Sequence, residues 1–184
     1  MPARKIERRS RYFLAVEGES EQSFVAWLQM LSQERLHIHL DAVVLGGGGF
    51  NSMLRKAVKE HERRCKAFGI YRDRFLVVDG DRASKGDWSI EELKSHASEY
   101  RITVIVQKPN HEGLLLRLLP GRERRVPNAS SASALLKAQW PNYEKPVNAN
   151  TLRCRYSLGD LIRVATFDED LAMLLERIGL MNTP

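Results

Sequence analysis

Four short apolar runs alternate with helical segments along this chain, and this alternation limits its fold more than any other feature. Each run is of strand length and rich in β-branched and other apolar residues. The runs lie at residues 11–16, 39–46, 74–80 and 101–107. Because helical segments separate successive runs, we expect an α/β protein with a mainly parallel four-stranded sheet that is flanked by helices.

The segment 20–36 shows the helical pattern most clearly. Its large apolar residues recur at helical spacing and form one stripe, made of Phe24, Trp27, Leu28 and Leu31. The stripe predicts that this helix packs against the sheet and that Trp27 lies in the core.

Residues at helix ends predict where the later helices begin and end. Gly69 is expected to end the second helix, and Ser89 with Glu92 forms a capping box at the start of the third. Thr166 with Glu169 predicts the same box for the last helix of the chain.

The character of the sequence changes after the fourth run, where helical patterns follow one another without further strands. We therefore expect an α/β core over residues 1–119 and a helical C-terminal extension over residues 120–184 that packs on it. No apolar run approaches the roughly 18 to 20 residues of a membrane span, and no signal peptide is evident. These features predict a cytoplasmic protein without a membrane partner.

The basic balance of the chain favours an anionic partner. Its formal charge is +6 and its pI is near 9.5. Clustered Lys and Arg displace counterions from a phosphate backbone, so nucleic acid is the predicted partner. The alternative is that these residues are ordinary solvated surface groups. The candidate contacts are Arg4, Lys5, Arg8, Arg9 and Arg11 before the first run, and Arg82, Arg122, Arg124 and Arg125 after later runs.

Acidic side chains follow the first and third runs. Glu17 comes directly after the first run, and Asp79 and Asp81 end the third on either side of Gly80. The carboxyl ends of parallel strands meet at one edge of the sheet, where ligands bind. Glu21 lies on the first turn of the next helix and is expected to face the same space. Carboxylates gathered in this way repel one another unless a cation lies between them.

Carboxylate oxygens are the ligands that Mg²⁺ and Mn²⁺ prefer in proteins. The sequence therefore predicts a metal site formed by Glu17, Glu21, Asp79 and Asp81, with Glu17, Asp79 and Asp81 as the catalytic residues of phosphodiester hydrolysis. Each acidic motif taken alone is also typical of a helix-capping loop or a turn.

The order of these motifs resembles that of the TOPRIM superfamily. TOPRIM domains have an α/β core with a glutamate after the first strand and a DxD pair after the third, which match Glu17 in VEGESE and Asp79 and Asp81 in VVDGDR. Within the superfamily, the chain is most similar to the RloB-like proteins of bacterial restriction and defence loci. That group has a proline and glutamate motif after the fourth strand, and KPNHEGLLLRL places Pro109 and Glu112 there.

The resemblance covers residues 11–119 and implies a Mg²⁺-dependent nuclease that acts on RNA or DNA in anti-phage defence. A partner ATPase of the defence system is a further implied partner. Aromatic residues flank the last glutamate in the family, whereas this chain has His111 and Gly113 at those positions. Glu112, His111 and Lys108 are therefore candidates for a supporting role around the metal, with a solvated loop histidine as the alternative for His111.

Two other functional classes share parts of this pattern. A phosphoacceptor receiver domain also has a Lys-Pro pair late in its sheet, but Lys108 and Pro109 follow the fourth run where a fifth strand is needed. Residues 46–49 are four glycines without the lysine and Ser/Thr of a P-loop, so they predict a loop that lets a substrate backbone approach. A non-catalytic TOPRIM-fold module that binds nucleic acid or an effector is the main alternative to the enzyme.

Overall fold

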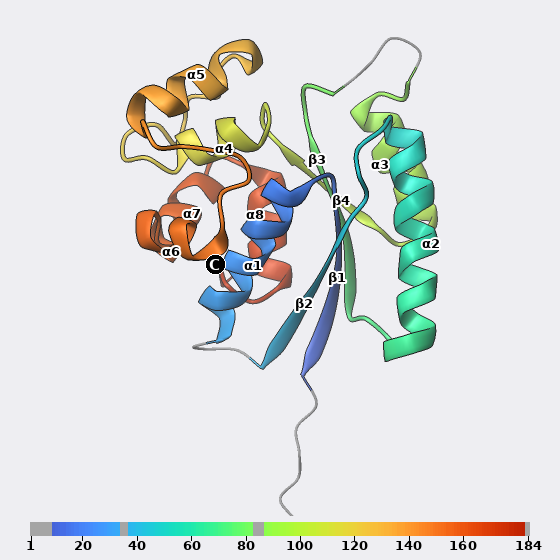
Figure 1. Ribbon diagram of the computed structural model, residues 1–184. Helices are drawn as coiled ribbons and strands as arrows, with labels where there is room; N and C mark the ends of the chain where they lie inside the picture. Colours follow the sequence, from blue (N-terminus) through green and yellow to red (C-terminus); the bar gives the residue numbers. More distant parts are fainter. Residues whose placement is uncertain (1–8, 34–36, 83–86, 183–184) are drawn as a thin grey trace, which may run out of the picture.

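A computed structural model describes residues 9–33, 37–82 and 87–182, and in this part of the chain four strands form one sheet. The strands are β1 (Ser10–Val16), β2 (Ile38–Val44), β3 (Asp73–Asp79) and β4 (Thr103–Gln107). Their order is β2-β1-β3-β4, and every neighbouring pair is parallel (Figure 1). The predicted α/β class with a four-stranded sheet is confirmed, and the sheet is parallel throughout.

Helices cover both faces of the sheet (Figure 1). On one face lies α1 (Glu19–Gln33), and on the other lie α2 (Phe50–Phe68) and α3 (Ile90–Glu99). Five further helices follow β4. They are α4 (His111–Arg117), α5 (Ala129–Gln139), α6 (Ala149–Arg155), α7 (Leu158–Ala165) and α8 (Glu169–Arg177).

The central strand β1 supplies side chains to both layers of the core. Leu14 and Val16 belong to the apolar cluster on the α1 side, whereas Phe13 and Ala15 belong to the cluster under α2 and α3. All four residues are fully buried. A continuous apolar run is what a parallel strand needs when helices cover both of its faces, and this explains the sequence of β1.

The helix α1 packs as its apolar stripe predicts. Trp27 is 0% exposed, and its ring lies 5.7 Å from that of Phe24 and 6.1 Å from that of Tyr156. Leu28 is also buried, and Leu31 is partly buried against the same cluster. Apolar residues of α5 to α8 belong to this cluster too, so the C-terminal helices share a core with β1 and α1. The division of the chain at residue 120 stays a prediction.

The helix ends agree with the sequence in two of three cases. Gly69 caps α2 with φ 90°, and Ser89 forms the expected capping box with Glu92. The box predicted for the last helix is wrong. Thr166 ends α7, where its hydroxyl donates to the carbonyl of Arg163, and the side chain of Asp168 caps α8 instead.

The capping box of the C-terminal region lies one helix earlier, between Ser157 and Asp160 at the start of α7. Across the described ranges, none of the helices combines the length and the apolar content that crossing a membrane requires.

Candidate functional site

The carboxyl ends of β1 and β3 lie next to each other and bring the predicted acidic residues to one edge of the sheet. Val16, the last residue of β1, is in register with Val44 of β2 and Val77 of β3. Glu17 follows Val16 directly, and Asp79 is the last residue of β3. Both carboxylates therefore emerge from neighbouring strands within about two residue positions of each other.

A tight turn after β3 places Asp81. The main-chain N–H of Gly80 donates to the carbonyl of Gln107, and that of Asp81 donates to the carbonyl of Pro109. A Cβ atom at Gly80 would lie 3.2 Å from the Pro109 oxygen, so glycine allows this close approach to the end of β4. Asp81 itself is exposed and accepts a hydrogen bond of 2.8 Å from the side chain of Asn110.

Glu17 is 6% exposed and forms an ion pair with Arg82 through Oε1. Its Oε2 atom is buried and finds no hydrogen-bond donor among the described residues. The carbonyl of Glu17 accepts from the main-chain N–H groups of Gly46 and Gly47, at 3.1 and 3.2 Å. These two glycines have φ values of 73° and 69°, so the glycine loop can fold over the end of β1.

Glu21 faces the same edge from the first turn of α1, as the sequence predicts. It is 6% exposed, and its Oε2 accepts a hydrogen bond of 2.9 Å from the main-chain N–H of Gly18. Its Oε1 lies 3.7 Å from Nδ1 of His111.

Burial and the neighbouring carboxylates together shift the ionisation of this group. Burial raises the pKa of Asp79 to about 7, and the charges of Glu21, Glu17 and Asp81 add to the effect, whereas the hydrogen bond from the His111 N–H opposes it. The pKa of Glu17 is also raised, first by burial, while the charge of Arg82 lowers it. We call Glu17, Glu21, Asp79 and Asp81 the carboxylate cluster.

The cluster supplies the right kind of ligand for a hard divalent cation, but its side chains are engaged with protein groups. Arg82, the N–H of His111, the N–H of Gly18 and Asn110 each bind one of the carboxylates. Within the described ranges, no three His, Cys, Asp or Glu side chains are arranged to hold an ion. The carboxylate oxygens are the kind of ligand that Mg²⁺ and Mn²⁺ prefer, and Oε2 of Glu17 is unpaired among the described residues, so the predicted metal site stays a prediction.

His111 begins α4 and is 2% exposed, so the alternative of a solvated loop histidine is wrong. Burial lowers its pKa to about 3, and the charge of Lys145 adds to the effect, so the imidazole is neutral at neutral pH. Its ring packs edge-on against that of Phe24 at 6.1 Å, and its main-chain N–H donates to Asp79 at 2.9 Å. His111 therefore contacts the cluster both through its main-chain N–H and through its ring Nδ1, which lies 3.7 Å from Oε1 of Glu21.

Glu112 contacts Tyr143 and Lys145, two residues that the motifs did not predict. It is 3% exposed, accepts a hydrogen bond of 2.8 Å from the hydroxyl of Tyr143 and forms an ion pair with Lys145. Burial raises the pKa of Tyr143, and the charges of Glu21 and Asp79 contribute, which places this ring beside the carboxylate cluster. The C-terminal region thus adds a phenol and an ammonium to the site.

Lys108 does not join the carboxylate cluster. Its Nζ lies 3.2 Å from Oδ2 of Asp170 and 3.8 Å from Oδ1 of Asp168, so the side chain faces the start of α8. Among the described residues no contact links Lys108 to the carboxylate cluster, and its supporting role stays a prediction.

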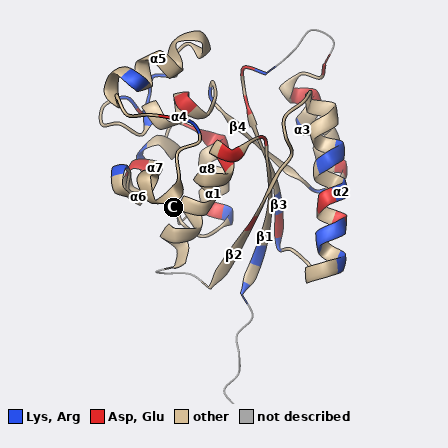
Figure 2. Ribbon diagram, viewed as in Figure 1, with Lys and Arg blue, Asp and Glu red and all other residues tan. Residues whose placement is uncertain are grey.

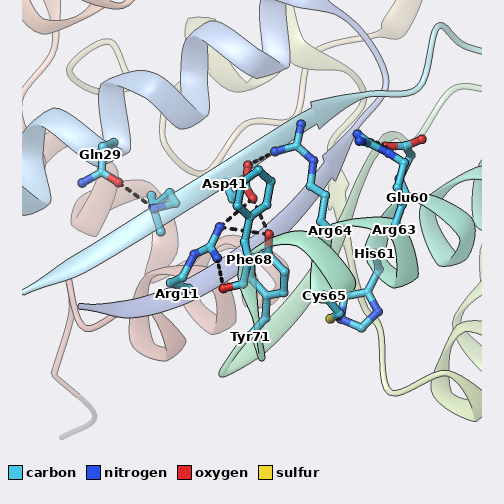
Figure 3. A network of polar contacts seen from close by, with 11 residues as sticks. Arg11, Gln29, Asp41, Glu60, His61, Arg63, Arg64, Cys65, Phe68 and Tyr71 are labelled. Atoms are coloured by element: carbon cyan, nitrogen blue, oxygen red, sulfur yellow. Dashed lines mark hydrogen bonds and ion pairs between the residues drawn. The ribbon is translucent and has the colours of Figure 1, made fainter. Parts of the chain in front are cut away.

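The predicted arginine contacts lie in different surroundings. Arg122 and Arg125 line a cavity of about 600 Å³ beside α4 and α5, whereas Arg124 stacks on Phe167 at 4.6 Å. Arg11 of the N-terminal group binds Asp41 on β2, as Figure 3 shows. Arg4, Lys5 and Arg8 lie outside the described residues.

Comparison of the chain with protein-family models, with curated proteins and with solved structures found no match. The resemblance to TOPRIM domains and RloB-like proteins therefore stays a prediction that the motif residues themselves carry.

Proposed function

We propose that this protein is a divalent-metal-dependent nuclease that hydrolyses phosphodiester bonds of RNA or DNA at the carboxylate cluster. The observation that carries the proposal is the gathering of four carboxylates beside the ends of β1 and β3, where burial, and then the neighbouring charges, raise the pKa of Asp79 to about 7. Such crowding of like charges costs folding energy, and strongly perturbed carboxylates are typical of functional sites.

Glu17, Asp79 and Asp81 would hold the metal, and Glu21 would support them from α1. Mg²⁺ or Mn²⁺ bound there would supply the activation of water and the polarisation of the scissile phosphate. The residues of the chain have roles that follow from their contacts. The Gly18 N–H orients Glu21, and the His111 N–H orients Asp79.

Two cations border the cluster and could meet a phosphate oxygen. Arg82 is bound to Glu17 and Lys145 to Glu112, and their side chains are 45% and 56% exposed. Transfer of the guanidinium or ammonium to a phosphate would leave a buried carboxylate without its cation, which costs stability unless a metal ion replaces that cation. We expect both residues to bind the substrate backbone next to the scissile bond. Burial keeps the imidazole of His111 neutral at neutral pH, which disfavours a role as general acid.

The arginine group around the 600 Å³ cavity belongs to the same proposal. Arg122 and Arg125 would bind phosphates away from the scissile bond, because the acidic cluster itself repels nucleic acid. The role in anti-phage defence beside a partner ATPase, which the resemblance implies, is part of the proposal as well.

A second candidate is a non-catalytic module that binds nucleic acid or an effector. The observation that favours it is the engagement of Glu17 by Arg82 and of Glu112 by Lys145, since these ion pairs hold the carboxylates without a metal. Both candidates predict nucleic-acid binding, and only the first predicts turnover.

The test is a cleavage assay on labelled tRNA, single-stranded DNA and plasmid, with Mg²⁺, Mn²⁺ or EDTA. Wild type should cleave at least one substrate with metal and none with EDTA. Glu17→Gln, Asp79→Asn and Asp81→Asn should abolish cleavage while the fold and most of the binding persist. Glu62→Gln, an exposed position on α2, is the control for loss of one carboxylate.

Cleavage that survives all three substitutions would place the active site elsewhere. Binding without cleavage of any substrate under any metal would favour the non-catalytic module.

A further inference from the structure

We propose that a basic groove along the free edge of the sheet binds the phosphate backbone of the nucleic-acid strand that enters the carboxylate cluster. This inference rests on the proposed function. It identifies a surface for binding nucleic acid that the motifs did not indicate. The groove has a volume of about 500 Å³ and lies between the outer side of β2 and α2. We call it the edge groove, and its charged lining residues are Lys56, Lys59, Glu60, Arg63 and Arg64.

One wall of the edge groove is the backbone of β2, which is the outermost strand of the sheet. The main-chain N–H of Leu45 donates to the carbonyl of Val16 in β1. The N–H and C=O groups of odd-numbered residues in β2 therefore point toward β1. The N–H of Leu40 accordingly faces outward, where it donates to the side chain of Gln29. By the two-residue period of a strand, the N–H groups of Ala42 and Val44 face the groove and offer donors to an anion.

The other wall carries four basic side chains and one acidic one. Figure 2 shows the basic residues as successive bands along α2. Glu60 binds Arg63 at 2.8 Å, and Arg64 binds Asp41 on β2 (Figure 3). Glu60 and Asp41 each form an ion pair with an arginine. The positive charges of Lys56 and Lys59 therefore remain available to a ligand.

Lys56 is held at the end of the groove nearest the site. Its Nζ donates to the carbonyls of Leu45 and Gly47, at 2.9 and 3.0 Å. Carbonyl oxygens orient an ammonium without neutralising it, and one of its three N–H donors stays free of these two bonds. A phosphate at this point would meet a full positive charge in a fixed position.

The same glycine loop connects the edge groove to the carboxylate cluster. Gly47 donates its N–H to the carbonyl of Glu17 and accepts from Lys56 with its own carbonyl. From Lys56 to Arg63 the helix rises about 10 Å, which matches roughly three phosphates at about 3.4 Å of axis per charge. A strand bound along the groove would therefore run toward Glu17.

The matched pair Lys59→Glu and Lys66→Glu tests this assignment. Both lysines are exposed on α2, and both substitutions change the charge equally, but only Lys59 lines the groove. Binding of labelled single-stranded RNA, single-stranded DNA and duplex DNA is measured by fluorescence anisotropy in EDTA, so that neither metal nor cleavage contributes. A thermal melt checks that each variant is folded.

We expect Lys59→Glu to weaken binding about tenfold and to reduce the slope of log K against log salt by about 0.7 to 0.9, the value of one phosphate contact. Lys66→Glu should bind within about twofold of wild type. Equal loss in both variants, or no loss in Lys59→Glu, would overturn the edge groove. Wild-type binding to polyglutamate but to no nucleic acid would overturn it as well.

The outcomes separate this inference from the proposed function. A Lys59-specific loss of binding in a protein that cleaves nothing would support the groove and reject the nuclease. Cleavage that depends on Asp79 while Lys59→Glu binds like wild type would support the nuclease and reject the groove.

Discussion

The raised pKa of Asp79 predicts an unusual dependence of stability on pH. An ordinary aspartate titrates near 3.8, whereas Asp79 titrates near 7 in the folded protein because of burial and of the charges on Glu21, Glu17 and Asp81. Between these two values the folded state binds more protons than the unfolded state. The contribution of Asp79 to the free energy of unfolding therefore falls as the pH rises toward 7, whereas the lowered pKa of the buried His111 acts in the opposite direction below its ordinary value of 6.5.

The size of the effect follows from the two pKa values. At about pH 5 a group with a pKa of 3.8 unfolded and about 7 folded contributes about 3 kcal/mol of stability relative to its ionised form, and at about pH 8 it contributes almost nothing. Partial contact with water screens part of this electrostatic free energy. We therefore expect the ionisation of Asp79 to lower the stability by about 2 kcal/mol between about pH 5 and about pH 8.

Asp79→Asn isolates this contribution, because the amide oxygen can still accept the hydrogen bond from the His111 N–H. Urea unfolding is measured for both proteins in EDTA at about pH 5 and about pH 8. The variant should lose about 2 kcal/mol less stability than wild type across this range, and it should be the more stable protein at about pH 8. Equal pH dependence of the two proteins would show that Asp79 titrates normally and that the cluster is not electrostatically strained.

Three further substitutions test the framework of the site by urea unfolding. Trp27→Ala should cost about 3 to 5 kcal/mol, because the indole is fully buried under the sheet; a cost below about 1 kcal/mol would mean that α1 packs differently. Arg117→Ala should cost a similar 3 to 5 kcal/mol, since it removes the buried ion-pair partner of Asp168 and leaves the more exposed Lys108 at 3.8 Å; a neutral result would contradict that pair. Tyr143→Phe should cost about 1 to 2 kcal/mol by removing the donor to Glu112, and an unchanged stability would contradict this contact.

Much of the fold could be predicted from the sequence because its signals are local. The apolar runs of β1 and β3 are buried from both faces, and the stripe around Trp27 has the period of a helix. The error at Thr166 has a tertiary cause. Asp168 caps α8 and also binds the buried Arg117, a partner 51 residues away that no local pattern reveals.

The same distinction explains the site. Glu17, Glu21 and Asp79 could be placed together because strand order alone brings the ends of β1 and β3 to one edge. Tyr143 and Lys145 could not, because they reach Glu112 from a segment without strands or motif spacing. The rule that parallel strands place their carboxyl ends at one edge predicts which strand residues lie together. It does not predict which later loops pack against that edge.

The central claim is that the carboxylate cluster binds a divalent cation, and Mn²⁺ binding tests it most directly. Titration of the pure protein is followed by the electron paramagnetic resonance signal of the free ion, without nucleic acid. We predict that wild type binds Mn²⁺, more tightly above about pH 7 because protons compete for Asp79. Asp79→Asn should weaken binding by at least about tenfold, whereas Glu62→Gln should bind like wild type. Absence of Mn²⁺ binding to wild type, or equal binding to wild type and Asp79→Asn, would contradict the claim.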